Sequence, residues 1–231
     1  MEAAGGCQVI GSGENIGIGP AYRALVEAAT TEFILFLECD WRLTGDSPVE
    51  HVEAALSLIR RGSADVVRLR SRTRPGWPVN ETQFQNRELS YPRWLLGSAL
   101  YEPRPERLFP GLIRDEEGWL LASSQYANWT NNPHLARRSF VVDHVLPWCG
   151  EAGIQLEGLI DEYWDNGGFK VAQGRGLFTH ERLDGPRFRA QSLTSRIGYW
   201  PRIALRRHLR RIVASRGGAR ARRRSPGASG V

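Results

Sequence analysis

The sequence predicts an α/β fold in which helices cover both faces of a mostly parallel sheet, giving three layers. The first observation is the unbroken apolar run Phe33–Leu37, which is typical of a strand buried on both faces. The second is the alternation of strand-like and helix-like segments between Gln8 and Leu69. Such alternation favours a sheet whose strands are joined by helices.

The N-terminal segments fit this pattern in order. Gln8–Ile10 is a short candidate strand, and a glycine-containing turn follows it. A helix is expected over Ile18–Ala29, because apolar residues recur there at helical spacing and Pro20 suits a first turn. The apolar strand at Phe33–Leu37 comes next.

A second helix and a third strand follow. Ser47-Pro48-Val49-Glu50 has the pattern of a capping box with proline at the first helical position. This helix is expected to end near Gly62, before a strand over Ala64–Leu69. Its buried face would consist of Val49, Val52, Leu56 and Ile59.

The second half of the chain is less regular. From Ser71 to about Asn131 it is rich in arginine, proline and aromatic residues, which predicts a loop-rich subdomain packed on the sheet. A minority of these aromatics could instead line a cleft. The remaining expected elements are a turn at Asn131–Leu135, a helix or extended piece at Ser139–Leu146, a helix around Leu159–Trp164 that stops at Gly167 or Gly168, and strands at Phe169–Ala172 and Leu177–His180.

Charge divides the 231-residue chain into a domain at 1–184 and a tail at 185–231. The tail holds 13 Arg and no acidic residue, so the preceding part has 18 basic and 25 acidic side chains, a formal charge of −7. Ile203–Val213 has the pattern of a basic amphipathic helix, and Gly217–Val231 is expected to be disordered. An anionic membrane surface, nucleic acid and no dedicated partner are the three alternatives.

Several function classes are excluded by missing patterns. Cys7, Cys39 and Cys149 show no CxxC spacing, so neither a zinc site nor a disulfide framework is indicated. Gly13, Gly17 and Gly19 do not have the G-x-G-x-x-G spacing of a dinucleotide-binding loop. No apolar run is long enough to cross a bilayer, and no signal-peptide pattern is present. We therefore expect a cytoplasmic protein, with peripheral membrane contact through the tail as an option.

Candidate site residues stand at the ends of predicted strands and helices. Glu38 and Asp40 directly follow the apolar strand, where paired carboxylates can hold a divalent cation and a sugar hydroxyl. The alternative is two solvated acids in a loop. Glu157 would lie at a helix N-terminus, where the dipole favours an ionised carboxylate. His180 would end a strand, although a single histidine is more often structural than a ligand.

These segments, in this order, resemble a GT-A-fold glycosyltransferase of the family 2 type. Glu14-Asn15-Ile16-Gly17, the helix after it, and Glu32–Asp40 are similar to the family's asparagine-glycine turn, its alanine-rich helix and its DXD strand, with Glu38-Cys39-Asp40 as the motif. Glu157–Val171 is similar to its acid, helix, glycine and strand segment. The resemblance runs from Cys7 to about Gly185. It implies that the family's first strand–helix unit is missing.

The resemblance also implies roles. Asp40 and His180 would bind Mn²⁺ or Mg²⁺, Glu38 would contact the donor ribose or the metal shell, and Asn15 would belong to the donor site. Glu157 would be the general base that activates an acceptor hydroxyl. The donor would be a UDP- or GDP-linked sugar. The alternative is a non-catalytic remnant that binds carbohydrate, membrane or RNA.

Overall fold

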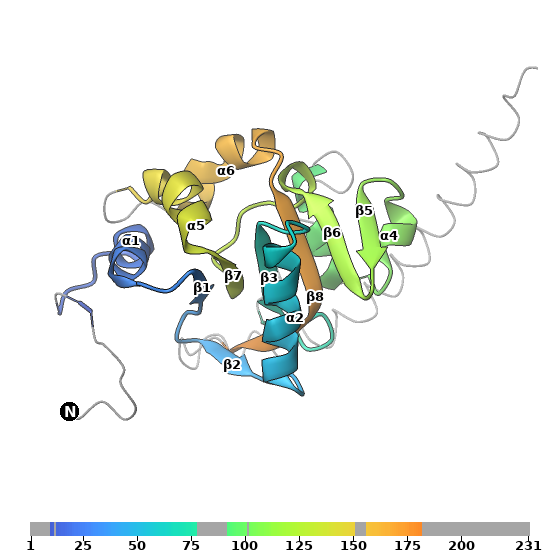
Figure 1. Ribbon diagram of the computed structural model, residues 1–231, viewed down its shortest axis with the longest axis horizontal. Coiled ribbons are helices and arrows are strands. Elements are labelled where there is room, and N and C mark those ends of the chain that lie inside the picture. The colour runs from blue at the N-terminus through green and yellow to red at the C-terminus, as the bar shows by residue number, and fades with distance from the viewer. Residues whose placement is uncertain (1–9, 12, 78–91, 101, 151–155, 182–231) are drawn as a thin grey trace, which may run out of the picture. The chain divides into compact units, whose positions relative to one another are not determined.

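A mixed sheet of eight strands forms the centre of the computed structural model (Figure 1), which describes residues 10–11, 13–77, 92–100, 102–150 and 156–181. Along the sheet the strands follow the order β1-β7-β3-β8-β6-β5, and β2 and β4 also pair with β8. The strands are β1 (Phe33–Phe36), β2 (Trp41–Leu43), β3 (Val66–Arg70), β4 (Gly76–Trp77), β5 (Ile113–Glu116), β6 (Trp119–Ser123), β7 (His134–Arg137) and β8 (Lys170–Glu181).

Helices and helical turns connect these strands. The α-helices are α1 (Ile18–Ala28), α2 (Pro48–Arg60), α4 (Pro105–Leu108), α5 (Arg138–His144) and α6 (Leu156–Asn166). The short 3₁₀ turns are η1 (Pro92–Trp94), η2 (Leu96–Leu100), η3 (Ser124–Tyr126) and η4 (Leu146–Trp148). The predicted α/β class is therefore confirmed, and the segment after Ser139 is helical.

The prediction of a mostly parallel sheet is wrong, because most neighbouring strands are antiparallel. β7 lies between β1 and β3 and is antiparallel to both, and β6 is antiparallel to β5 and β8. Parallel pairing joins only β3 and β4 to β8 in the described sheet. β7 is only four residues long and directly follows the turn at 131–133, so its sequence gave no strand signal of its own.

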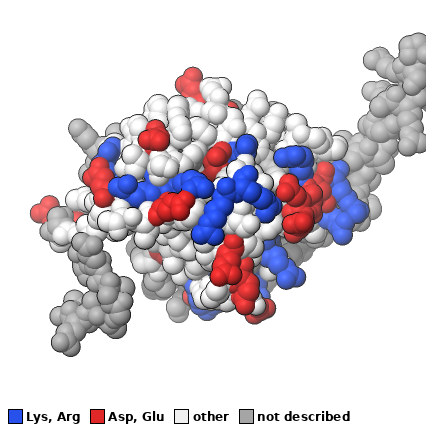
Figure 2. Space-filling model, in the orientation of Figure 1, with Lys and Arg blue, Asp and Glu red and all other residues white. Residues whose placement is uncertain are grey.

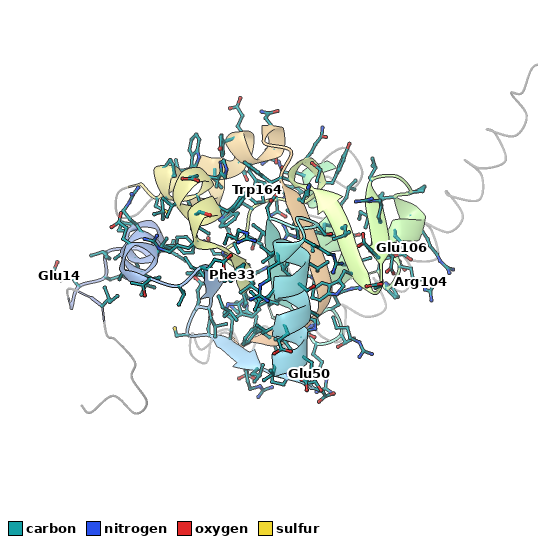
Figure 3. The ribbon with its side chains drawn as sticks, viewed as in Figure 1. Glu14, Phe33, Glu50, Arg104, Glu106 and Trp164 are labelled. Carbon is teal, nitrogen blue, oxygen red and sulfur yellow. The ribbon has the colours of Figure 1, made fainter. Side chains whose placement is uncertain are left out.

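Helices cover both faces of the sheet, as predicted. On one face, Tyr22 and Val26 of α1, Ile160 and Trp164 of α6 and residues of α5 pack against the sheet in one apolar core. On the other face, α2 packs against Val67, Leu69 and their neighbours in a second core. Figure 3 shows Trp164 in the interior beneath α6. The face of β3 that carries Val66 is thus the face that α6 covers.

β1 is an edge strand and is not buried on both faces. Among the described strands it pairs with β7 alone. Leu35 and Leu37 are 39% and 43% exposed, whereas Phe36 is 8% exposed. The strand predicted from the unbroken apolar run is therefore confirmed, but the prediction that it is buried on both faces is wrong. The expected strand at Gln8–Ile10 lies almost wholly outside the described residues; Ile10 itself is described and is not in a strand.

α2 begins at Pro48 as predicted, but Ser47 does not cap it. Ser47 adopts the left-handed conformation (φ 51°), and its side chain makes no capping hydrogen bond. Of the predicted buried face only Val49 is exposed, at 64%. Ile59 is buried and Val52 and Leu56 pack on the same core, which the fully buried Ala55 and Leu58 extend. The helix ends before Gly62, whose φ of 72° suits glycine.

β8 is one long strand where two short ones were predicted. It spans Lys170–Glu181, and its pairing with β3 shifts register between Arg68 and Arg70. At the shift Gly176 has φ 76°, and a Cβ there would lie 2.1 Å from the backbone oxygen of Arg70. Glycine is therefore required where the strand bends. The bend lets the first half of β8 pair with β6 and the second half with β2.

The loop-rich prediction for residues 71–131 missed a hairpin. β5 and β6 pair through a two-residue turn in which Glu117 and Gly118 have φ of 54° and 85°. Two positive φ values define the tight turn that matches strand twist. Trp119 and Trp129 are buried, so these aromatics pack in the core as expected. No helix among the described residues is long and apolar enough to cross a membrane.

The described residues belong to one compact unit, which ends at Glu181. The predicted helix at Ile203–Val213 and the tail at 185–231 lie outside the described residues.

Candidate functional site

Asp40 and His180 meet because β2 pairs with β8. In this antiparallel pairing Trp41 is opposite His180, and the Glu181 N–H donates to the Asp40 carbonyl oxygen at 2.7 Å. His180 Nε2 then lies 2.8 Å from Asp40 Oδ2. Two residues that are far apart in sequence are thus held together by backbone pairing and do not depend on flexible side chains to meet.

Asp40 has one further oxygen, and it is unsatisfied. Asp40 Oδ1 is buried and accepts no hydrogen bond from any described residue. A buried carboxylate oxygen without a donor is costly, which points to a cation or a donor group supplied by a ligand. The Trp41 ring lies 4.5 Å from the His180 ring, and the Arg70 guanidinium lies 5.3 Å from the Trp41 ring. This stack fixes the histidine.

Glu38 is half-buried and lies within electrostatic reach of Asp40 and Glu157. Burial raises its pKa, and the negative charges of Asp40 and Glu157 raise it further. The Trp41 indole partly opposes this increase, although its buried N–H completes no hydrogen bond of ordinary geometry within the described chain. Asp40 and Glu157 are therefore both near enough to act on Glu38.

Glu157 lies in the first turn of α6, as predicted. Its Oε1 accepts a hydrogen bond from the Asn131 N–H at 2.8 Å. Its second oxygen makes no hydrogen bond to a described residue, so it can accept a proton from a ligand. The turn before β7, which was predicted only as a turn, thereby orients the carboxylate.

Arg68 is a site residue that the sequence analysis missed. Its side chain is buried on β3 (7% exposed), and it donates to the Asn128 carbonyl oxygen. Burial lowers its pKa to about 10, and the charge of Glu157 partly opposes this decrease. The sequence signal for a buried arginine was the segment Val-Val-Arg-Leu-Arg at 66–70. On a strand, Arg68 and Arg70 share the face of Val66, which is the face towards α6.

A buried polar row crosses the sheet at the level of Arg68. His134 on β7 and Gln173 on β8 are its register partners, and each is 2% exposed. His134 Nε2 lies 3.1 Å from the Tyr22 hydroxyl, and its Nδ1 lies 2.9 Å from the Asn132 carbonyl oxygen. Burial lowers the pKa of His134 to about 4, so at neutral pH it is an uncharged support for the neighbouring turn.

Asn15 is not brought to this cluster by any contact among the described residues. Its Oδ1 accepts a hydrogen bond from the Gly17 N–H at 3.0 Å, which closes the turn before α1. Figure 3 shows the neighbouring Glu14 at the periphery, beyond α1. A structural role in starting the helix accounts for Asn15.

The charged surface elsewhere is mixed. Figure 2 shows acidic and basic side chains interspersed over the face that carries α2. Several are paired, as in the bridge between Arg61 and Glu116 at 3.3 Å. Glu38, Asp40 and Glu157 are called the acidic cluster below. The face that carries α2 has no extended surface of one charge sign that would compete with this cluster as a binding site.

Metal-binding capacity rests on two residues. The described chain holds no group of three or more His, Cys, Asp or Glu side chains arranged for a metal ion. Asp40 and His180 nevertheless offer a carboxylate and an imidazole at one point, with Asp40 Oδ1 unsatisfied. Mg²⁺ is commonly held by one or two carboxylates together with substrate phosphates, so this set fits a cation that binds with a diphosphate.

Comparison of the chain with protein-family models, curated proteins and solved structures gives no match. The class of protein that the fold and site define is therefore an α/β protein with an acidic cluster at one end of a mixed sheet.

Proposed function

We propose that the chain transfers a sugar from a UDP- or GDP-linked donor to an acceptor hydroxyl, as metal-dependent GT-A-type glycosyltransferases do. The observation that carries this proposal is the 2.8 Å contact between Asp40 Oδ2 and His180 Nε2, two of the four residues expected to form the site. Glu38 and Asp40 follow β1, Glu157 begins α6, and His180 lies near the end of β8. They are linked by the contact between Asp40 and His180 and by the effect of Glu157 on Glu38.

Asp40 and His180 would hold Mn²⁺ or Mg²⁺ between them. The bound cation would neutralise the developing charge on the leaving diphosphate, which is the largest electrostatic demand of the transfer. Asp40 Oδ1 would then gain a partner. Glu38, whose raised pKa favours a protonated carboxyl more than usual, suits a hydrogen bond to a ribose hydroxyl.

Glu157 would take the proton from the acceptor hydroxyl. The Asn131 N–H fixes one carboxylate oxygen and leaves the other for the acceptor. The negative charge of Glu157 and the positive charge of Arg68 attract each other. A positioned carboxylate of this kind contributes roughly 10²- to 10⁴-fold to a proton-transfer step.

A non-catalytic binding module is the alternative function. It is favoured by the hydrogen bond that joins Asp40 to His180 directly, because a site closed in this way needs no cation to be stable. The two functions differ in one measurable property. Only the transferase requires donor binding that depends on a divalent cation.

The test is a thermal-shift screen of the full chain against UDP, GDP and their sugar conjugates, with and without Mn²⁺. A ligand that binds only the folded state raises the melting temperature. We expect a rise with one nucleotide that EDTA removes, followed by release of that nucleotide when an acceptor mixture is added. A cooperatively melting chain that shows no shift with any of these ligands contradicts the proposal and favours the binding module.

A further inference from the structure

A hollow is lined mainly by residues of α6 on the helix face opposite Glu157. It has a volume of about 470 Å³ and is open to solvent. Its lining consists of Trp148, Leu159, Glu162, Tyr163, Asn166 and Gly167. This hollow is called the α6 pocket below. None of its lining residues takes part in the site described above.

Two aromatic rings that pack on each other belong to the lining of the α6 pocket and are called the aromatic wall here. The rings of Trp148 and Tyr163 are 5.2 Å apart with an angle of 34° between their planes, and both side chains are half-buried. The Tyr163 hydroxyl lies 2.7 Å from His144 Nδ1. Phe169 packs against both Tyr163 and His144. The aromatic wall is therefore held in place before any ligand arrives.

The rim of the α6 pocket carries polar groups that are available to a ligand. The Glu162 carboxylate is exposed and makes no ion pair or hydrogen bond with a described residue. The Asn166 Nδ2 donates to the Glu162 carbonyl oxygen at 2.9 Å, and Asn166 also lines the pocket. The Trp148 indole N–H likewise makes no hydrogen bond within the described chain. Acceptors and a donor thus surround the aromatic wall.

We propose that the α6 pocket binds a saccharide through an equatorially substituted pyranose ring. Such a ring presents a flat apolar face of C–H groups, which would pack on the half-buried Trp148 indole beside Tyr163, and a rim of hydroxyls, which would bond to Glu162 and Asn166. A nucleotide or phosphate is disfavoured, because the lining holds a carboxylate and no Lys or Arg.

The α6 pocket is separate from the proposed transfer chemistry. Leu159, Glu162, Tyr163 and Asn166 are spaced along one face of the helix, whereas Glu157 lies on the opposite face. Between Glu157 and Tyr163 the helix rises about 9 Å. The saccharide binding proposed here does not depend on the transferase proposal and would persist in a chain with no donor site.

The experiment is a titration of the full chain with cellotetraose and, separately, with chitotetraose. Isothermal calorimetry and tryptophan fluorescence measure the binding. We expect saturable binding at sub-millimolar to millimolar concentrations. Trp148→Ala should weaken binding at least about tenfold, whereas Trp148→Phe should retain most of it, because one aromatic face is kept. Glu162→Gln alters only an exposed side chain and should weaken binding several-fold without affecting folding.

Two controls separate this proposal from others. Tyr126→Ala removes a half-buried aromatic ring that lines a different hollow and should leave saccharide binding unchanged. Asp40→Asn should also leave it unchanged, even where it abolishes donor binding. The proposal is overturned if neither tetrasaccharide binds at millimolar concentration, or if Trp148→Ala and Glu162→Gln leave the affinity unchanged. It is also overturned if sedimentation shows that the chain is a dimer and that these variants are monomeric, because the pocket would then be a contact between two copies.

Discussion

His180 Nε2 lies 2.8 Å from Asp40 Oδ2, although the two residues are 140 positions apart. Pairing of β2 with β8 places them together, so this contact is part of the sheet. The same geometry would also serve the cation-bound state that we propose. Without a cation the imidazole can donate to the carboxylate, and with a cation both atoms can turn to it as ligands. The predictions below start from this pair.

Asp40→Asn should abolish metal-dependent donor binding while preserving the fold. Asparagine has the same shape and can still contact His180, but it lacks the charge that attracts a hard cation. We expect kcat/KM of the proposed transfer to fall at least about 100-fold. Asp46→Asn is the matched control, since Asp46 is an exposed acid in the loop after β2. Equal Mn²⁺ affinity in wild type and Asp40→Asn would exclude Asp40 as a ligand.

Glu157→Gln should reduce turnover and leave donor binding intact. Glutamine can still accept the Asn131 N–H hydrogen bond, so the turn before β7 is retained. It cannot take a proton from the acceptor, and the expected loss in kcat is roughly 10²- to 10⁴-fold. Parallel calorimetry with the nucleotide and single-turnover kinetics separate the two effects. A variant with unchanged kcat would remove Glu157 from the mechanism.

Glu38→Gln should stabilise the folded chain at neutral and alkaline pH. Because burial and the charges of Asp40 and Glu157 raise the pKa of Glu38, the folded state prefers its protonated form. Its contribution to stability is full below the unfolded pKa and is lost as pH rises through the higher folded pKa. The variant should therefore gain most over wild type at pH 8 and little at pH 4. Urea unfolding at both pH values measures the difference, and an equal gain at both would contradict this assignment.

His134 should make the protein sensitive to acid. Its folded pKa of about 4 lies below the ordinary value of 6.5, so its neutral form is favoured on folding. This contribution is present above pH 6.5 and is lost as pH falls towards 4, with a total on the order of 3 kcal/mol. His134→Gln keeps a polar group for Tyr22 but does not titrate. Between pH 6.5 and pH 4 the free energy of unfolding of the His134→Gln variant should therefore fall less than that of wild type. If both free energies fall equally with pH, His134 is not the cause of the acid sensitivity.

The sequence predicted individual elements better than their arrangement. Apolar spacing located α1, α6 and the strand at Phe33–Phe36, because local periodicity records which side of an element is buried. It could not show that Leu35 would be exposed, since that depends on which strand lies beside β1. The four-residue β7 was missed for the same reason, and it is the strand that makes the sheet mixed.

The candidate site was predictable where an acid or histidine ends an element, as for Asp40 and His180. Arg68 was not predicted, because a cation within an apolar strand was counted as part of that strand. Its role depends on Asn128 and Glu157, which reach it only in the folded chain. A test of side-chain alternation within Val66–Arg70 would have separated the two arginines from Val67 and Leu69.

The position of β8 has a consequence for synthesis of the protein. β8 is the last described strand to leave the ribosome, yet it pairs with β2, β3, β4 and β6. Until Glu181 has emerged, β3 and β6 lack the neighbour that joins them, and their unpaired edges are open to other chains. Sheet closure must therefore follow translation of nearly the whole domain, a regime in which chaperones and translation speed affect yield more than local helix stability does.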